Sequence, residues 1–380
     1  MNDLLHYRER FAIFEDVAYL NSCSQGALAG SVRGAMDSYM NSMVEFGSDW
    51  GQWAGKQEEV RGQLGELLGA NVDEVAITPS ASAAVNSFAS SLFLDGKKSK
   101  VVTTSLEFPT IGQIWHAQER RGVTVQHVQA DAHHQLHLAD FADAIDDDTA
   151  VVSVTHICYR NGAMSDIRSI IDLAHDRGVP VLVDAYQSGG AYPIDFHEMG
   201  ADFLVGGALK YMLGMPGVAF GLVNSATMSD YVPTATGWFA ARDIFSMDIA
   251  SYVPAVDARR FESGTPVIPS LYAVAEGLRI LLEVGVDRAW ERSGALHDLV
   301  RHGVSDMGGT VVTPAGEGAH GPLLAFASHN EEALVAALEH DGVVVSSRDG
   351  NIRVSPHFYN DESDVDRLFS SLRTHRHLFA

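Results

Sequence analysis

An acid and an amine each follow a short apolar run in the stretch from Val179 to Asn224. One run, residues 181–183, ends on Asp184, and a second, residues 203–205, leads through two glycines to Lys210. Such runs are typical of buried strands in a parallel sheet, so both side chains are expected to face one crevice. A carboxylate and a desolvated amine in one pocket suit Schiff-base chemistry on pyridoxal phosphate, although a surface Asp and a surface Lys would be the more ordinary state of such residues.

The elements around this stretch predict how the two groups are positioned. Short apolar runs alternate with amphipathic segments from Glu74 onward, which predicts a mainly parallel sheet with helices on both faces and ligands at the carboxyl ends of the strands. Two helices precede this α/β pattern, at 31–46 and 56–69, and a mixed α+β pattern follows it. The α/β pattern consists of apolar runs at 75–77, 101–102, 123–125, 151–154 and 181–183, with helices at 82–94, 110–121, 138–145 and 166–177. The α+β pattern that follows consists of helices at 269–284, 287–306, 330–340 and from 361, with strands near 310, 323, 343–345 and 352–354.

Composition excludes several classes of protein. The chain has 380 residues, of which 46% are hydrophobic, so it can bury a large core and is long enough for two domains. With 26 basic against 49 acidic residues, its net charge of -23 argues against nucleic acid or an anionic membrane as partner. The two cysteines, Cys23 and Cys158, do not form a secreted-type disulfide framework, and the first residues lack an apolar signal core, so we expect a cytoplasmic protein.

The turn Thr78-Pro79-Ser80-Ala81-Ser82 places hydroxyl groups where a helix begins. Free backbone N–H groups and the helix dipole at such a point favour an anion, which makes this turn a candidate phosphate cradle. A serine is also an ordinary N-cap residue, so the turn alone leaves both interpretations open.

Two further groups of residues invite a functional interpretation. The segment Asp131-Ala132-His133-His134-Gln135-Leu136-His137 offers metal ligands, but we interpret it as a solvated loop and predict no metal site. Arg353, on an apolar strand, could pair with a surface acid or capture a carboxylate in bidentate fashion.

Taken together, the motifs at 78–86, 107–110, 184–187, 206–217, 261–266 and 353–366 resemble those of class V aminotransferase-like pyridoxal phosphate enzymes. This group holds cysteine desulfurases, selenocysteine lyases, kynureninases and isopenicillin N epimerase-like proteins. The resemblance implies the fold-type I pyridoxal phosphate transferase fold, with an N-terminal arm (1–20) that packs with the small domain, a large cofactor-binding domain (21–266) and a small α+β C-terminal domain (267–380). It also implies a homodimer with shared active sites that acts on a small-molecule amino acid substrate.

The resemblance assigns roles residue by residue. Lys210 would carry the internal aldimine, Asp184 would bind the ring nitrogen and Gln187 would lie near the phenolic oxygen, while Cys158 stands where relatives have an Asn. The other implied roles are phosphate binding by Ala81 and Ser82, ring stacking by Phe108, a contribution of Gly264 and Thr265 to the partner subunit's phosphate site, carboxylate binding by Arg353, and substrate contact by Asn21 and Cys23.

Sequence motifs and a cysteine that the chain lacks narrow the range of possible reactions. The G-x-G-x-x-G turn of dehydrogenases and the G-x-S-x-G turn of serine hydrolases are both missing. The stretch 339–352, where a desulfurase would carry its persulfide-forming thiol, contains no cysteine. Phe108 and the motifs at Trp238, Gly264-Thr265 and Arg353 are similar to those of kynureninases. Gln187 in place of the usual His of that group, and Cys158 in place of its Asn, indicate that L-kynurenine itself is not the substrate. We therefore expect lyase-type chemistry at Cβ, with transamination as the alternative and a catalytically silent cofactor-binding protein as the second alternative.

Overall fold

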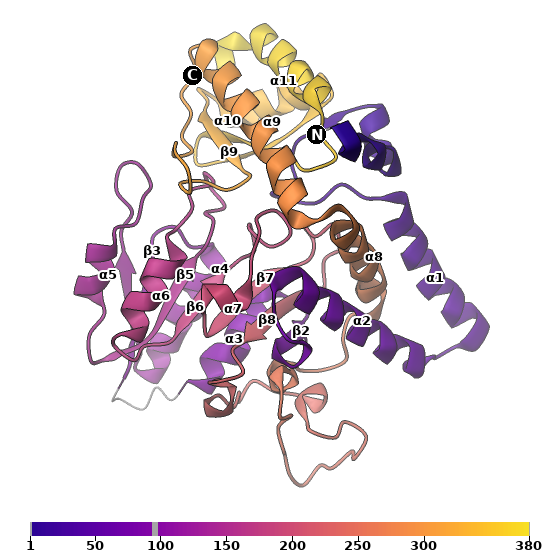
Figure 1. The fold of residues 1–380 in the computed structure, drawn as a ribbon, viewed down its shortest axis with the longest axis vertical. Coiled ribbons are helices and arrows are strands. Elements are labelled where there is room, and N and C mark those ends of the chain that lie inside the picture. Colours follow the sequence, from indigo (N-terminus) through magenta and orange to yellow (C-terminus); the bar gives the residue numbers. More distant parts are fainter. Residues whose placement is uncertain (1, 93–97, 380) are drawn as a thin grey trace.

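A seven-stranded sheet forms the centre of the computed structural model, which describes residues 2–92 and 98–379 (Figure 1). The five strands from β7 to β4 run parallel, whereas β8 lies antiparallel to both of its neighbours, so the prediction of a mainly parallel sheet is confirmed. In spatial order the strands are β2 (Val75–Thr78), β8 (Ala219–Val223), β7 (Phe203–Gly207), β6 (Val181–Asp184), β5 (Thr149–Thr155), β3 (Lys100–Thr104) and β4 (Thr124–Val128).

Apolar side chains cover both faces of this sheet. Val181 and Val183 belong to one core cluster, whereas Leu182 between them belongs to another, as the alternation of side chains along a strand requires. Because both faces of the sheet are buried, the central strands consist of consecutive apolar residues that do not alternate with polar ones.

Helices supply the crossovers that parallel neighbours need. The predicted helix 82–94 begins one residue earlier, and its last two residues lie outside the described part of the chain. The predicted helix 110–121 ends as a 3-10 turn, Gln118–Arg121. The helices of this layer are α3 (Ala81–Ser91), α4 (Pro109–Ala117), α5 (Leu138–Ala144), α6 (Ile167–His175) and α7 (Phe196–Met199).

Three longer helices pack together beside the sheet. Helix α8 (Ile268–Val284) contacts both α1 (Gly30–Phe46) and α2 (Trp50–Leu68), and α1 extends away from the sheet (Figure 1). Helix α1 ends at Gly47, before α2 begins, and the φ of 73° at Gly47 lies in the region that favours glycine. The predicted start of the second helix at residue 56 was too late, since Asp49 caps it and accepts a hydrogen bond from the Gln52 backbone.

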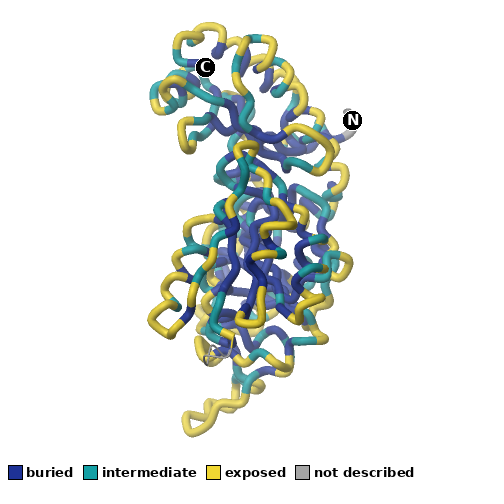
Figure 2. Tube along the Cα trace, turned by 90° about the vertical axis from the view of Figure 1, so that its left-hand side faces the viewer, coloured by how far each residue is buried: buried dark blue, intermediate teal, exposed yellow. Residues whose placement is uncertain are grey.

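The C-terminal residues form a smaller lobe with its own apolar core, and Figure 2 shows buried residues inside both lobes. Its antiparallel sheet has the order β11-β12-β9. The strand predicted near 310 is only a single bridge, between Val311 and Phe326. The elements of the lobe are α9 (Val286–Asp306), β9 (Leu324–Ala327), α10 (Glu331–His340), β10 (Val343–Val344), β11 (Ser346–Arg348), β12 (Asn351–Val354) and α11 (Glu362–Thr374).

The first residues lie against this lobe. Strand β1 (Ala18–Tyr19) pairs in parallel with β10, and Arg8 donates to Asp364 over 2.7 Å. These contacts agree with an arm that packs on the small lobe, while the domain boundaries at residues 20 and 266 stay a prediction. None of the helices in the described ranges is sufficiently long and apolar to cross a membrane. The remaining 3-10 helices are Asn2–Arg10, Ala12–Glu15, Val72–Glu74, Met228–Asp230, Trp238–Ala240, Ala258–Phe261 and Arg376–Leu378.

Candidate active site

Asp184 and Lys210 line the same cavity, at the carboxyl ends of the parallel strands. Its volume is about 320 Å³, within the range of small-molecule sites. The cavity lies where β3, β5 and β6 end and where α3 and α4 begin. It brings together six residues singled out from the sequence, Ala81, Ser82, Phe108, Asp184, Gln187 and Lys210.

Asp184 is the last residue of β6 and is 5% exposed. Its Oδ1 accepts a hydrogen bond of 2.8 Å from the Tyr186 backbone N–H. Burial raises the pKa of this carboxyl, whereas the Tyr186 N–H and the charge of Lys210 lower it. The acid is therefore held at a fixed place beside the cavity, and a cationic partner there would stabilise its charged form.

Lys210 follows β7 in the tight segment that leads to β8. Burial lowers the pKa of its amine to about 8, although Cys23 and Asp184 act in the opposite direction. An amine with this pKa is partly unprotonated near neutral pH, which a nucleophile toward an aldehyde requires.

Two aromatic rings face the amine of Lys210. Its Nζ lies 4.5 Å from the centre of the Tyr186 ring and 6.0 Å from the centre of the Phe108 ring. Gly207 makes room for the first ring, because a Cβ there would stand 2.4 Å from the Tyr186 ring. Sequence reasoning missed Tyr186, although its position between Asp184 and Gln187, inside the motif 184–187, indicates that it lies near the site.

The turn before α3 lines the cavity with the start of that helix. Ser80 caps α3 by accepting a hydrogen bond from the Ala83 N–H, and Ala81 is the first helical residue. The Ser82 hydroxyl lies 3.5 Å from the hydroxyl of Thr110, which also lines the cavity and was not predicted. Free N–H groups and hydroxyls thus border the cavity at one end.

Gln187 and Cys158 differ in their access to the cavity. Gln187 lines it, and its Nε2 donates to the Cys23 carbonyl over 3.2 Å, while its buried Oε1 has no partner within the described residues. The Cys158 side chain instead packs with Leu106 and Ala163, and burial raises the pKa of its thiol. The structure therefore places Cys158 behind the cavity wall rather than in it.

Gly264 and Thr265 lie apart from Lys210. They border a separate small hollow together with Glu262 and Gly217. Within the chain these two residues therefore do not line the cavity.

Arg353 is a buried cation with neutral partners. It is 3% exposed, and it donates to the Tyr159 carbonyl over 2.7 Å and to the hydroxyls of Ser346 and Ser24 over 2.9 and 3.2 Å. Its Nε has no partner, and it forms no ion pair with the described residues. Because a buried charge is costly without an opposite charge, this guanidinium is a candidate anion-binding group. Arg353 is not itself in the cavity wall, but Ser24 and Tyr159 are.

The segment that carries Asn21 and Cys23 runs between Arg353 and Gln187. Asn21 forms a bridge with Ser355, and the Cys23 thiol lies 3.8 Å from both the Asn21 Oδ1 and the Ser346 hydroxyl. Cys23 is 1% exposed, so of this segment Ser24 is the residue that reaches the cavity wall.

Glu107 is a second buried acid near Asp184 that sequence reasoning missed. Its Oε1 accepts hydrogen bonds from the Thr104 hydroxyl and the Thr155 N–H, whereas its buried Oε2 has no partner in the described residues. Burial, followed by the charge of Asp184, raises the pKa of this carboxyl well above its usual range. Both effects favour the neutral form of Glu107, whose hydrogen bonds tie the ends of β3 and β5 together.

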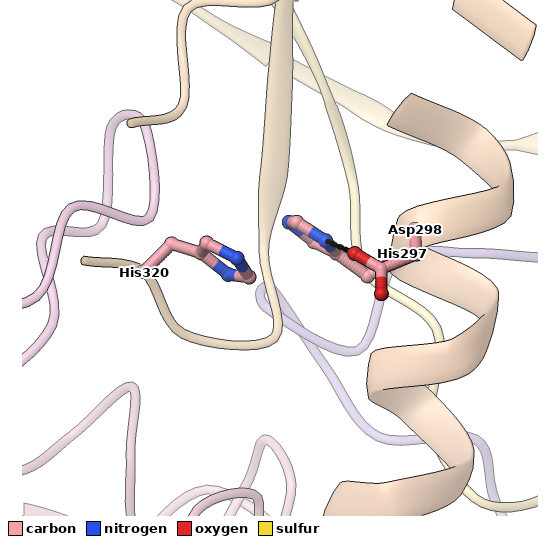
Figure 3. Close-up of side chains that lie close together, drawn as sticks. All are labelled: His297, Asp298 and His320. Carbon is pink, nitrogen blue, oxygen red and sulfur yellow. Dashed lines mark ion pairs between the residues drawn. The ribbon is translucent and has the colours of Figure 1, made fainter. Parts of the chain in front are cut away.

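The histidine-rich loop behaves as a turn, and a different cluster gathers possible metal ligands. Asp131 accepts backbone hydrogen bonds from His133 and Gln135 in the loop. His297, Asp298 and His320 form a cluster of ligand atoms within 4.8 Å of one another (Figure 3).

The two rings of this second cluster stack at 4.2 Å with an interplanar angle of 11°, so their in-plane lone pairs do not converge on one point. Burial lowers the pKa of both histidines, and the nearby charge of Arg301 lowers it further and also disfavours a cation. We interpret the pair His297 and His320 as a packing contact.

Comparisons with known proteins agree with this geometry. The family model "Aminotransferase class-V" matches residues 35–368. An uncharacterized aminotransferase, YcbU of Bacillus subtilis (strain 168), is 35% identical over 360 residues, which is 94% of each chain. A kynureninase of Pseudomonas fluorescens is 30% identical, covering 92% of this chain and 86% of its own. A solved structure of a C-DES variant with glycine covalently linked to its PLP cofactor shares the fold with a TM-score of 0.89 at 20% identity, over 96% of this chain and 98% of that one.

The fold likeness confirms the fold-type I architecture expected from the motifs. The family match covers most of the chain, including Asp184, Lys210 and Arg353. The chain therefore belongs to the class V aminotransferase family.

Proposed function

We propose that this protein is a pyridoxal phosphate-dependent enzyme that acts on an amino acid, with Lys210 holding the aldehyde of the cofactor. The observation that carries the proposal is the shared cavity of Lys210 and Asp184, one a desolvated amine and the other a buried acid. Family membership and the PLP-bound structural neighbour support the same cofactor.

The residues present fit this cofactor. The N-terminus of α3, with Ala81 and Ser82, suits its phosphate, and the unpartnered Gln187 Oε1 suits a hydroxyl donor. Asp184 suits the protonated ring nitrogen, because a nearby negative charge raises the pKa of a cationic acid. Phe108 and Tyr186 offer ring faces directed at the same amine, which suits a planar ring between them.

When bound, the cofactor would supply an electron sink for the bond broken at the substrate. Lys210 would take and return the proton at Cα through Nζ, a task that its pKa of about 8 suits. Arg353 would orient the substrate by its α-carboxylate, since its buried guanidinium has no other opposite charge among the described residues. Glu107 would position Asp184 by holding the neighbouring strand ends.

For the reaction, we infer lyase-type cleavage or elimination at Cβ of a substituted amino acid. Transfer through a persulfide on the enzyme has little support, because the one thiol near residues 339–352 in space is Cys23, which is 1% exposed. A buried thiol has no access to a sulfur acceptor. The likeness to kynureninases favours chemistry at Cβ, whereas the likeness to YcbU favours transamination as the second candidate.

Product analysis separates these outcomes. Incubation with β-substituted amino acids should release a keto acid and ammonia, or a shortened amino acid, while the cofactor remains an aldehyde. Stoichiometric conversion of the cofactor to its amine form, reversed by a keto acid, would establish the aminotransferase instead. A visible absorption band that no amino acid alters would identify a catalytically silent binding protein.

We also propose a homodimer with shared sites. Large apolar side chains are exposed at the end of α1, where Val44 is 89% exposed, and in the loop after β8, where Phe245 and Ile249 are 77% and 101% exposed. Both segments project from the sheet (Figure 1), and exposed apolar surface of this kind marks a contact with another chain. The partner subunit's Gly264 and Thr265 would then complete the phosphate site.

We further propose that the protein is cytoplasmic, with which its two free cysteines are consistent.

A further inference from the structure

Three guanidinium groups, of Arg353, Arg160 and Arg348, lie near Tyr159 at the Lys210 cavity, in a chain whose net charge is -23. Tyr159, which lines the cavity, provides the reference point. Its carbonyl accepts from Arg353, its ring lies 5.9 Å from the Arg160 guanidinium, and the charge of Arg348 contributes to lowering its pKa, against the larger effect of burial. This local excess of positive charge runs against the overall balance of the protein.

Arg348 is positioned by the pairing of β11 with β12. Ser346 stands opposite Arg353 in this pair, and its hydroxyl accepts from that guanidinium. Side chains two residues apart on a strand point to the same face of the sheet. The Arg348 side chain therefore points to the same face of β11 as the Ser346 side chain, which contacts Arg353.

The hairpin that ends β11 is tight and tethered. Asp349 and Gly350 both have positive φ, 52° and 78°, as a two-residue turn with the twist of the strands requires. The Gly350 N–H also donates to Glu331 over 2.9 Å. The backbone of Arg348 is thereby fixed relative to the cavity.

The charge of Arg348 is not neutralised within the described chain. Its guanidinium has no hydrogen bond or ion pair with the described residues, and the carboxylate of its neighbour Asp349 lies 3.7 Å from the Arg160 guanidinium instead. The charge of Arg348, like that of Arg353, acts to lower the pKa of the Lys210 amine, in addition to the larger effect of burial. Arg348 is thus a cation that acts on the reacting amine and is free to take an anion.

We propose that Arg348 binds a second anionic group, carried by the side chain of the substrate, so that the substrate class is amino acids with an acidic side chain. This inference rests on the proposed function, in which Arg353 takes the α-carboxylate. Arg353 is already surrounded by Tyr159, Ser24 and Ser346 and is buried, so a second anion is bound by the more exposed Arg348.

The test uses matched acid and amide ligands on the reconstituted holoenzyme. Titration of the cofactor absorbance should give a lower dissociation constant for L-aspartate than for L-asparagine, and for L-glutamate than for L-glutamine. Arg348→Gln should weaken binding of the acids by about three- to tenfold, as expected for one partly exposed charged pair, and change binding of the amides less than twofold. Arg373→Gln, which removes an exposed arginine of α11, should change neither.

Equal affinity for acid and amide, or an equal loss of both in Arg348→Gln, would overturn the inference and leave the proposed function intact. A cofactor spectrum that no amino acid alters would count against the proposed function alone. In that case the second anion site is tested with succinate and butyrate, which carry two carboxylates and one, respectively. Neither has an amine, so their binding requires no covalent step. Succinate should raise the melting temperature more than butyrate, and Arg348→Gln should abolish the difference; no difference in the unaltered protein would refute the second anion site.

Discussion

The side-chain amine of Lys210 lies over the faces of two rings, 4.5 Å from the centre of Tyr186 and 6.0 Å from the centre of Phe108. A planar group attached to this amine would therefore lie against aromatic faces contributed by the ends of two different strands. Burial of the amine and the two rings together make this one place suited to a flat, covalently held cofactor.

The first prediction concerns the covalent link. Lys210→Ala should abolish the borohydride-trapped adduct with pyridoxal phosphate, whereas Lys56→Ala should retain it, because Lys56 pairs with Glu59 on α2. In the unaltered apoprotein the rate of adduct formation should rise between pH 7 and pH 9 with a midpoint near 8. The sign follows from the lowered pKa, since the reactive amine is the unprotonated form that gains population as pH rises through about 8. Mass analysis that located the adduct on another lysine would end this assignment.

The second prediction concerns Asp184. Asp184→Asn should still bind cofactor but lose at least about a hundredfold in the rate of Cα proton exchange, because the neutral amide no longer holds the ring nitrogen protonated. The measurement is exchange of the Cα proton of a bound amino acid in deuterated water. Exchange at the unaltered rate would contradict the role.

The third prediction concerns Tyr186. Tyr186→Ala should weaken cofactor binding by about two- to tenfold through loss of one stacking face, whereas Tyr186→Phe should retain it. Fluorescence titration of the apoprotein with pyridoxal phosphate measures both. If Phe binds as weakly as Ala, the hydroxyl and not the ring face is the important group.

The fourth prediction concerns the shared site. Lys210→Ala and Thr265→Ala should each be inactive, and mixing the two should restore part of the activity, because one site in each mixed dimer would contain neither change. Subunit exchange is confirmed by native mass spectrometry. Mixed dimers without activity would argue for a site built from one subunit.

The fifth prediction concerns the ion pair that anchors the loop before Gly264. Glu262 is 2% exposed and accepts from Arg61 over 2.7 Å, from the Ile77 N–H and from Gln57. Replacing it with Leu leaves the buried Arg61 with the more exposed Glu58 as its one ion-pair partner among the described residues, and leaves the Ile77 N–H and Gln57 without their acceptor. The change should cost about 3–5 kcal/mol of unfolding free energy. Urea denaturation measures this loss. The double replacement of Arg61 and Glu262 with Leu should recover much of it, and failure to recover would show that the pair is needed for more than charge neutrality.

The sequence alone was sufficient for most helices and strands and for their order, although the strand expected near residue 310 is only a single bridge. The apolar runs at 181–183 and 203–205 are buried strands, as predicted, because short and fully apolar runs are typical of strands covered on both faces and are too short for a buried helix. It was also sufficient to place Asp184 and Lys210 together, since the carboxyl ends of neighbouring parallel strands meet at one edge. Four of the motifs that carry the family resemblance, at 78–86, 107–110, 184–187 and 206–217, lie at or shortly after strand ends of this sheet.

Only the tertiary structure decided how the cavity wall is completed. Tyr186 faces Lys210 because Gly207 on the neighbouring strand leaves room for its ring, a dependence between residues that no single motif expresses. Cys158 lies behind the wall although its neighbours Ile157 and Tyr159 line it, because successive residues at a strand end point to opposite sides. Composition, periodicity and motif order are properties of the chain read locally, whereas the direction of a side chain and its distance from Lys210 depend on which distant segments pack beside it.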